Sequence, residues 1–163
     1  MSEQDKQNPL NKRMIIILRV NEQAERFYGK AQELGKIAAL SFNEMKSAEK
    51  SRHRSQMTGL ENIADTTLKV SDVLDYIKKQ IARRQAWTAV VDGQRFGESL
   101  KTYIENDLKN MVNKVCESVG IGNETEEDMR DRQRIHLDLT RQLIRQIVVH
   151  YEYAVSPAER PAQ

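Results

Sequence analysis

The chain has 163 residues, of which 31% are charged and 39% are hydrophobic, and its formal net charge is +2. This length suits one domain that buries about two thirds of its unfolded surface without a metal or a disulfide. A charge so close to balance gives no support for nucleic-acid binding by itself, so that argument depends on local clusters. Cys116 is the one cysteine of the chain, which excludes an internal disulfide and favours a reducing compartment.

Strong helix breakers are confined to the two ends of the chain, where its three prolines lie at positions 9, 157 and 161. Between them, apolar residues recur mostly three or four positions apart, which predicts amphipathic helices. The sequence therefore predicts an all-α fold, a bundle of about five helices that forms a single domain over residues 14–155. We expect a mobile N-terminal tail at residues 1–13 and a C-terminal tail at residues 156–163.

The longest apolar run, Met14 to Leu18, is far shorter than the roughly 20 residues of a membrane span. Arg19 interrupts it and no small-residue cleavage site follows, so it is not typical of a signal peptide. We expect a cytoplasmic protein that does not contact a membrane. The run suits either a strand or the start of a buried helix, and the helix is favoured because no second strand pattern is present to pair with it.

From Asn21 the spacing predicts a helix whose apolar face extends to Met45. Gly29 and Gly35 each weaken a helix by about 1 kcal/mol relative to alanine, so these glycines can instead mark close approaches between helices. Residues 47–55 are polar and basic, which predicts a connecting loop or a frayed helix end.

The stretch from Arg52 to Arg84 is the one around which we expect the chain to be organised. Its apolar stripe predicts either one helix or two helices joined near residues 65–71. Two are favoured, because Ser71 and Asp72 suit an N-cap and a first helical turn. Both ends of the stretch are basic, with Arg52 and Arg54 at the start and Lys78, Lys79, Arg83 and Arg84 at the finish.

The segment 85–97 predicts a loop that Trp87 pins to the bundle and that turns at Asp92-Gly93. The next helix begins near Phe96, and Gly120 is a typical C-terminal stop.

The last helix follows a capping pair of Thr125 and Asp128. We expect it to end near Val155, before Pro157. Basic residues line one side of this helix at spacings of seven and four, namely Arg134, Arg141 and Arg145. They suit either a phosphate backbone or acidic neighbours, since Asp131 and Asp138 lie close in sequence.

Residues with catalytic or metal-binding spacing are not evident. His53, His136 and His150 lack the Glu-x-x-His or His-Glu-x-x-His spacings of metal sites, and Cys116 has no base beside it in the sequence. We therefore expect no catalytic site, no metal and no cofactor. The excess of cations at Lys78–Arg84 over the nearby acids Asp72 and Asp75 is what a phosphate backbone needs.

A family resemblance also favours binding to a nucleic-acid backbone. Two features carry it: Ser55-Gln56-Met57 followed by Leu60 and a helix to Ile81, and a terminal helix ending in Val148-Val149-His150-Tyr151-Glu152-Tyr153. With them, the chain resembles the small helical subunit of type III-A/D CRISPR effector complexes over roughly residues 24–155. Thr58 stands where that family usually has Arg, and Arg52 and Arg54 lie one turn earlier. The resemblance implies a non-catalytic antiviral-defence subunit whose copies stack in a ribonucleoprotein and touch guide and target RNA backbones and neighbouring subunits.

The leading hypothesis is a structural subunit that holds RNA through basic helix faces. The residues expected at the RNA are Arg52, Arg54, Lys78, Lys79, Arg83, Arg84, Arg141 and Arg145. Its expected partners are guide and target RNA, other subunits of the same complex and neighbouring copies of itself. The rival from another class is a helical adaptor that binds acidic proteins and no nucleic acid, and a weaker rival is a helical enzyme whose site the sequence does not reveal.

Overall fold

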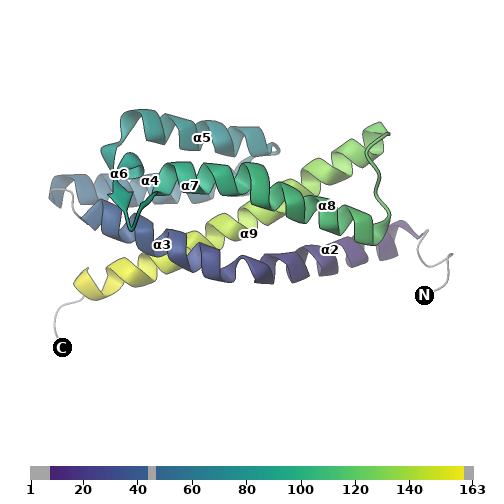
Figure 1. Cartoon of the computed structure of the whole chain (residues 1–163), viewed down its shortest axis with the longest axis horizontal. Coiled ribbons are helices and arrows are strands. Elements are labelled where there is room, and N and C mark those ends of the chain that lie inside the picture. Colours follow the sequence, from purple (N-terminus) through teal and green to yellow (C-terminus); the bar gives the residue numbers. More distant parts are fainter. Residues whose placement is uncertain (1–7, 44–46, 160–163) are drawn as a thin grey trace.

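The structure, a computed structural model, describes residues 8–43 and 47–159, except for the side chains of residues 43–53 and 156–159. It is an elongated helical bundle (Figure 1), which confirms the all-α prediction. Its longer helices are α2 (Pro9–Arg26), α3 (Tyr28–Asn43), α4 (Ser47–Thr66), α5 (Val70–Arg83), α8 (Leu108–Val119) and α9 (Glu126–Glu159). Between α5 and α8 lie α6 (Gln85–Thr88), the hairpin of β1 (Val90–Val91) and β2 (Gln94–Arg95), α7 (Phe96–Thr102) and a π-helical turn (Tyr103–Asp107).

Helix α9 is the axis of the bundle and runs diagonally across it in Figure 1. It packs on α3, α4, α8, α2 and α5. Its apolar stripe is almost completely buried, at Ile135, Leu139, Leu143, Ile144 and Ile147. The spacing of this stripe is what the sequence predicts for a core helix.

Helix α3 packs most closely on α9, and Gly35 permits the approach. A Cβ atom added at Gly35 would lie 2.7 Å from the Cβ of His150 and 2.8 Å from the carbonyl oxygen of Ile147. A Cβ atom at Gly29 would meet nothing within 4 Å. The close-approach interpretation is therefore correct for Gly35, whereas Gly29 lies in open space.

The N-terminal segment differs from the expectation in two ways. Helix α2 begins at Pro9, with Asn8 as its N-cap accepting the N–H of Leu10 at 3.1 Å, so residues 9–13 are helical and not a tail. The helix expected to run from Asn21 to Met45 is broken at Phe27, whose backbone leaves helical geometry while its ring is buried. Met45 lies outside the described residues.

The prediction of two helices in the central stretch is confirmed, because α4 ends at Thr66 and α5 begins at Val70. Ser71 is not the N-cap, which is Lys69. The turn is organised by Thr67, whose hydroxyl accepts the N–H of Lys69 at 3.1 Å and donates to the carboxylate of Asp72 at 2.5 Å. Residues 47–55, expected as a connecting loop or a frayed helix end, form the first turns of α4.

Trp87 pins the segment 85–97 as predicted, because its side chain is completely buried. Its Nε1 donates to Oε1 of Gln56 at 2.8 Å, and its ring lies 4.9 Å from that of Phe96. The segment is not a plain loop, since it forms α6 and the β1–β2 hairpin. Asp92 and Gly93 have φ angles of 51° and 75°, which suit the tight turn predicted there.

The caps predicted around the last connection are confirmed. Gly120 is left-handed with φ 76°, and the N–H of Ile121 donates to the carbonyl of Cys116 at 2.9 Å. The hydroxyl of Thr125 accepts the N–H of Asp128 at 3.0 Å. Helix α9 continues to Glu159 and passes Pro157, four residues beyond its expected end. The carbonyl of Tyr153 loses its helical donor at Pro157, but Tyr153 is exposed, so water can satisfy it.

The π-helical turn lies against α9 at His136. Its widened geometry brings the N–H of Leu108 to the carbonyl of Tyr103, five residues earlier. The Nε2 atom of His136 lies 2.9 Å from the carbonyl oxygen of Ile104, and a carbonyl only accepts, so Nε2 carries the proton and donates. Burial lowers the pKa of His136, an effect that the bond to Ile104 partly opposes.

Because the folded state lowers the pKa of His136, the unfolded chain takes up this proton first as the pH falls. Stability should therefore decline from about pH 6.5 downward through the folded pKa. In His136→Gln a neutral amide can still donate to Ile104, and the decline should be smaller. Urea denaturation at several pH values between 5 and 8 gives the free energy of unfolding of both proteins. The contribution of the carboxylates cancels in the difference between the two, because both proteins contain the same carboxylates. Identical pH dependences would contradict this account.

Candidate nucleic-acid interface

Helices α4 and α5 form an antiparallel pair, so the beginning of α4 lies beside the end of α5. The hydroxyl of Tyr76 on α5 donates to the carbonyl of Gln56 on α4 at 2.7 Å. The side-chain oxygen of the same Gln56 accepts the hydrogen bond from Nε1 of Trp87, a residue that follows α5 in the chain. The pairing therefore brings the two predicted basic clusters to one end of the molecule, at the left in Figure 1.

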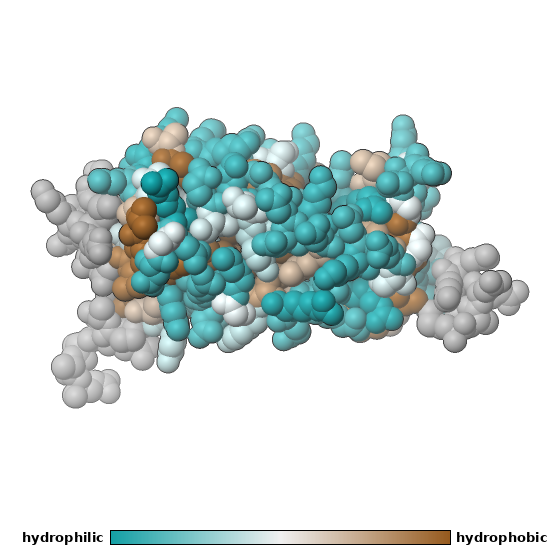
Figure 2. Space-filling view, viewed as in Figure 1, coloured by the Kyte–Doolittle hydropathy of each residue, from teal (hydrophilic) through white to brown (hydrophobic). Residues whose placement is uncertain are grey.

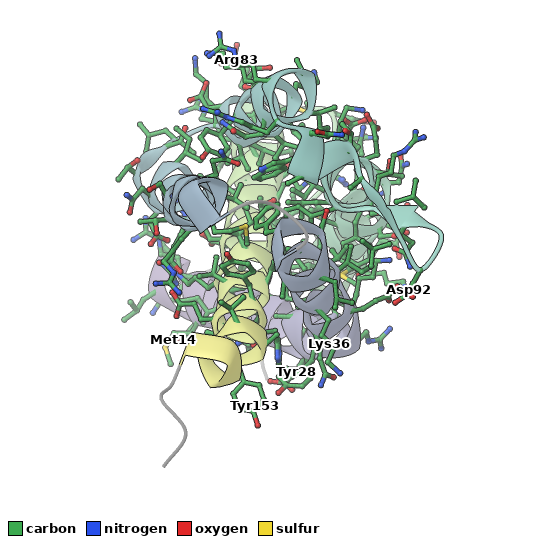
Figure 3. The ribbon with its side chains drawn as sticks, turned by 90° about the vertical axis from the view of Figure 1, so that its left-hand side faces the viewer. Met14, Tyr28, Lys36, Arg83, Asp92 and Tyr153 are labelled. Atoms are coloured by element: carbon green, nitrogen blue, oxygen red, sulfur yellow. The ribbon has the colours of Figure 1, made fainter. Side chains whose placement is uncertain are left out.

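The C-terminal end of α5 carries four solvent-exposed cations, Lys78, Lys79, Arg83 and Arg84. The Nζ atom of Lys78 lies 4.0 Å from a carboxylate oxygen of Asp75, one turn earlier. Lys79, Arg83 and Arg84 form no ion pair with any residue that the structure describes. Arg83 projects away from the ribbon in Figure 3. We call these four residues the α5 basic end.

Packing of α5 determines which side chains face outward. Val73 and Ile77 are completely buried on its inner face, and the cations occupy the opposite side of the same turns. Arg84 is extended at the junction with α6, where its N–H donates to the carbonyl of Gln80 at 2.8 Å and its carbonyl accepts from Trp87 at 3.1 Å. The backbone under the last arginine is therefore held firmly in place.

The phenol of Tyr76 lies within the same basic region. Burial raises the pKa of Tyr76, and the charge of Arg84 opposes that rise. The hydroxyl of the same ring is bonded to the carbonyl of Gln56 on α4.

Arg54 is exposed on α4, two residues before Gln56, and its carbonyl accepts the hydroxyl of Thr58 at 3.0 Å. The side chain of Arg52 lies outside the described residues. Of the two arginines predicted at the start of the central stretch, Arg54 therefore lies at the same end of the bundle as the α5 basic end.

Arg141 and Arg145, which were expected at the RNA, bind the C-terminal end of α4. Nε of Arg141 donates to the carbonyl of Ala64, and a terminal nitrogen donates to the carbonyl of Thr67, both at 2.7 Å. Arg145 lies 2.9 Å from a carboxylate oxygen of Asp65. These guanidinium groups are engaged within the fold, in contrast to those of Arg83 and Arg84.

The sequence suggested Asp131 and Asp138 as ion-pair partners of the arginines on the last helix, and this interpretation is correct for one of them. Arg141 lies 3.7 Å from Asp138, whereas Asp131 pairs with Lys12 of α2 at 3.7 Å and not with Arg134. Burial raises the pKa of Asp138, although the nearby arginines, Arg141 first, lower it. Asp65, the partner of Arg145 on α4, is 80 residues away in sequence, and no local pattern indicates it.

The remaining side chains that could bind a metal or act in catalysis are placed where they serve packing. Among the side chains that the structure describes, those of residues 8–42 and 54–155, no three His, Cys, Asp or Glu gather as a metal site requires. Burial raises the pKa of the Cys116 thiol, which disfavours the reactive thiolate. The ring of His150 packs edge-on against Tyr28 at 5.1 Å, and His136 binds Ile104.

None of the described helices combines the length and the apolar composition that crossing a bilayer requires. Comparisons of the chain with protein-family models, with curated proteins and with solved structures give no match.

Proposed function

We propose that this chain is a non-catalytic structural subunit of an RNA-guided ribonucleoprotein, of the CRISPR type III kind that its sequence resembles. The α5 basic end holds the backbone of guide or target RNA, and other faces contact neighbouring subunits in the cytoplasm. The observation that carries the proposal is the set of three cations, Lys79, Arg83 and Arg84, that have no ion pair among the described residues and converge with Arg54 at one end of the bundle.

A phosphate backbone is a better match for this arrangement than a specific base pattern. The cations are exposed at a helix end, and they line neither the groove between α2 and α9 nor the hollow between α3 and α7. Such cations bind nucleic acid by releasing counterions, and they position it without reading its sequence. We therefore assign RNA affinity, and not sequence recognition, to this end.

Removing two of these cations should change how RNA binding responds to salt. In Arg83→Ala/Arg84→Ala, the log–log dependence of affinity on salt should become shallower by about 1.4, which is about 0.7 for each lost phosphate contact on a single strand. Affinity should fall by a similar factor for different RNA sequences. Fluorescence anisotropy of labelled single-stranded RNA, measured with the purified chain from low salt upward, gives both quantities.

A matched control removes two arginines elsewhere that are also exposed and have no ion pair among the described residues, Arg26 and Arg95. Their replacement by alanine lowers the net charge equally and should leave the salt dependence close to that of the unmodified chain. Equal changes in the two double variants would show a general charge effect and not a site. If the unmodified chain binds no RNA at low salt but is captured by an acidic protein surface, the adaptor hypothesis replaces ours.

A further inference from the structure

Gln56 is the residue through which the start of α4 is joined to the end of α5. It lies two positions after Arg54, and it is the first buried side chain among those that the structure describes in α4. Its backbone carbonyl accepts the hydroxyl of Tyr76 at 2.7 Å, and its side-chain Oε1 accepts Nε1 of Trp87 at 2.8 Å. We call Gln56, Tyr76 and Trp87 the Gln56 junction.

The Gln56 junction leads directly to the α5 basic end. The rings of Tyr76 and Trp87 pack edge to face, with their centroids 6.4 Å apart, so the two partners of Gln56 also contact each other. The backbone N–H of Trp87 donates to the carbonyl of Arg84 at 3.1 Å. Gln56 is therefore linked through Trp87 to the backbone of Arg84, the last cation of the α5 basic end.

Gly59 makes room for the junction, three positions after Gln56 on α4. A Cβ atom at Gly59 would overlap the hydroxyl oxygen of Tyr76 and would lie 3.2 Å from the Cζ atom of the same ring. Any larger residue at this position would push the phenol away from the carbonyl of Gln56. Glycine weakens a helix interior relative to alanine, and the hydrogen bond between α5 and α4 is the physical reason for its presence here.

A fixed junction matters for RNA because the cations at this end of the molecule belong to two helices. Arg54 and the α5 basic end can contact one strand together only while α4 and α5 keep their relative position. When that position is set before binding, little ordering is left to be done as the RNA binds. Contact with one cluster then holds the strand beside the other at high effective concentration.

We propose that the residues of the Gln56 junction are positioning residues, which hold Arg54 and the α5 basic end so that one RNA strand contacts both at once. This inference rests on the proposed RNA function and deepens it, because the RNA site then consists of two helices and not of the end of α5 alone. The junction acts without touching RNA, since Gln56 and Trp87 are buried and the hydroxyl of Tyr76 is bonded to α4.

Tyr76→Phe removes the hydroxyl of the junction and keeps the ring. RNA affinity of the full chain should fall about threefold to tenfold, the range that one net hydrogen bond supplies, while circular dichroism shows unchanged helicity. Gly59→Ala should lower affinity similarly, because its methyl group displaces the same hydroxyl from the α4 side. The matched control is Tyr103→Phe, which changes another partly buried tyrosine, in the π-helical turn, and should leave affinity unchanged. Equal losses in the two tyrosine variants would overturn the proposal.

A salt series separates positioning from a general loss of stability. In the otherwise unmodified chain, Arg54→Ala should make the log–log dependence of RNA affinity on salt shallower by about 0.7, which corresponds to one phosphate contact on a single strand. In the Tyr76→Phe chain the same change should add little, because Arg54 is no longer held beside the strand. Equal changes of slope with and without the Tyr76 hydroxyl would overturn the positioning role, and so would an unchanged slope in Arg54→Ala itself.

The same measurements separate this inference from the RNA proposal on which it rests. If Arg83→Ala/Arg84→Ala makes the salt dependence shallower while Tyr76→Phe and Gly59→Ala bind RNA as the unmodified chain does, RNA lies at the α5 basic end and the positioning role is wrong. If the unmodified chain binds no RNA at low salt, both proposals are wrong.

Discussion

Replacing Gly35 by alanine should destabilise the fold by about 2–4 kcal/mol, which is a large fraction of the stability of a small domain. The added Cβ would lie 2.7 Å from the Cβ of His150, 2.8 Å from the Ile147 oxygen and 2.9 Å from the Tyr151 nitrogen. Two of these atoms belong to the backbone of α9, so rotation of a side chain cannot relieve the clash. Urea denaturation followed by circular dichroism gives the free energy of unfolding.

Gly29 supplies the matched control in the same helix. Nothing lies within 4 Å of a Cβ atom there, and alanine is the better helix former. Gly29→Ala should therefore leave stability unchanged or raise it by up to about 1 kcal/mol. If both glycine variants unfolded at the same urea concentration, α3 and α9 would not approach as closely as the structure indicates.

Replacing Arg141 by alanine should cost about 2 kcal/mol of stability or more, because two charge-assisted hydrogen bonds to the end of α4 are lost. Its side chain is only 24% exposed, so water replaces those bonds poorly. Arg141→Lys should restore little, since one ammonium group does not reproduce the two-pronged contact with Ala64 and Thr67. The same denaturation experiment measures both variants.

Arg145 is the control for Arg141, because it lies one turn later on the same helix. Its pair with Asp65 is exposed, so Arg145→Ala should cost less than about 1 kcal/mol. Neither change should reduce the salt dependence of RNA binding as the loss of Arg83 and Arg84 does. A stable Arg141→Ala protein with a much shallower salt dependence would assign Arg141 to the RNA instead.

Features that depend on neighbours in sequence were predictable. The apolar stripes, the left-handed stop at Gly120 and the cap at Thr125 each follow from residues within a few positions, and the structure confirms them. The break at Phe27 was not predictable, because no proline or glycine marks it and the burial of the ring depends on the whole bundle. The run from Met14 to Leu18 suggested a buried helix start, but three of its five residues, Met14, Ile17 and Leu18, are exposed.

The α5 basic end was predictable for a similar reason. The stripe through Val73 and Ile77 fixes which side of α5 is buried, so the side that holds the cations follows from helical spacing. The role of Arg141 was not predictable, because its partners on α4 lie more than 70 positions away in the chain. The antiparallel packing of α4 and α5 brings Arg54 to the α5 basic end, and it too rests on a contact between distant residues, Tyr76 and Gln56.

The face shown in Figure 2 is largely hydrophilic, with hydrophobic residues visible at its left end. The central claim is that RNA lies against the α5 basic end. Photo-crosslinking tests it most directly, with single-stranded RNA that carries a photoreactive base and with linked peptides mapped by mass spectrometry. Cross-links should concentrate on residues 76–87 and on the start of α4, and they should diminish in Arg83→Ala/Arg84→Ala at equal protein concentration. Cross-links confined to α2 or α9, or none at low salt, would contradict the claim.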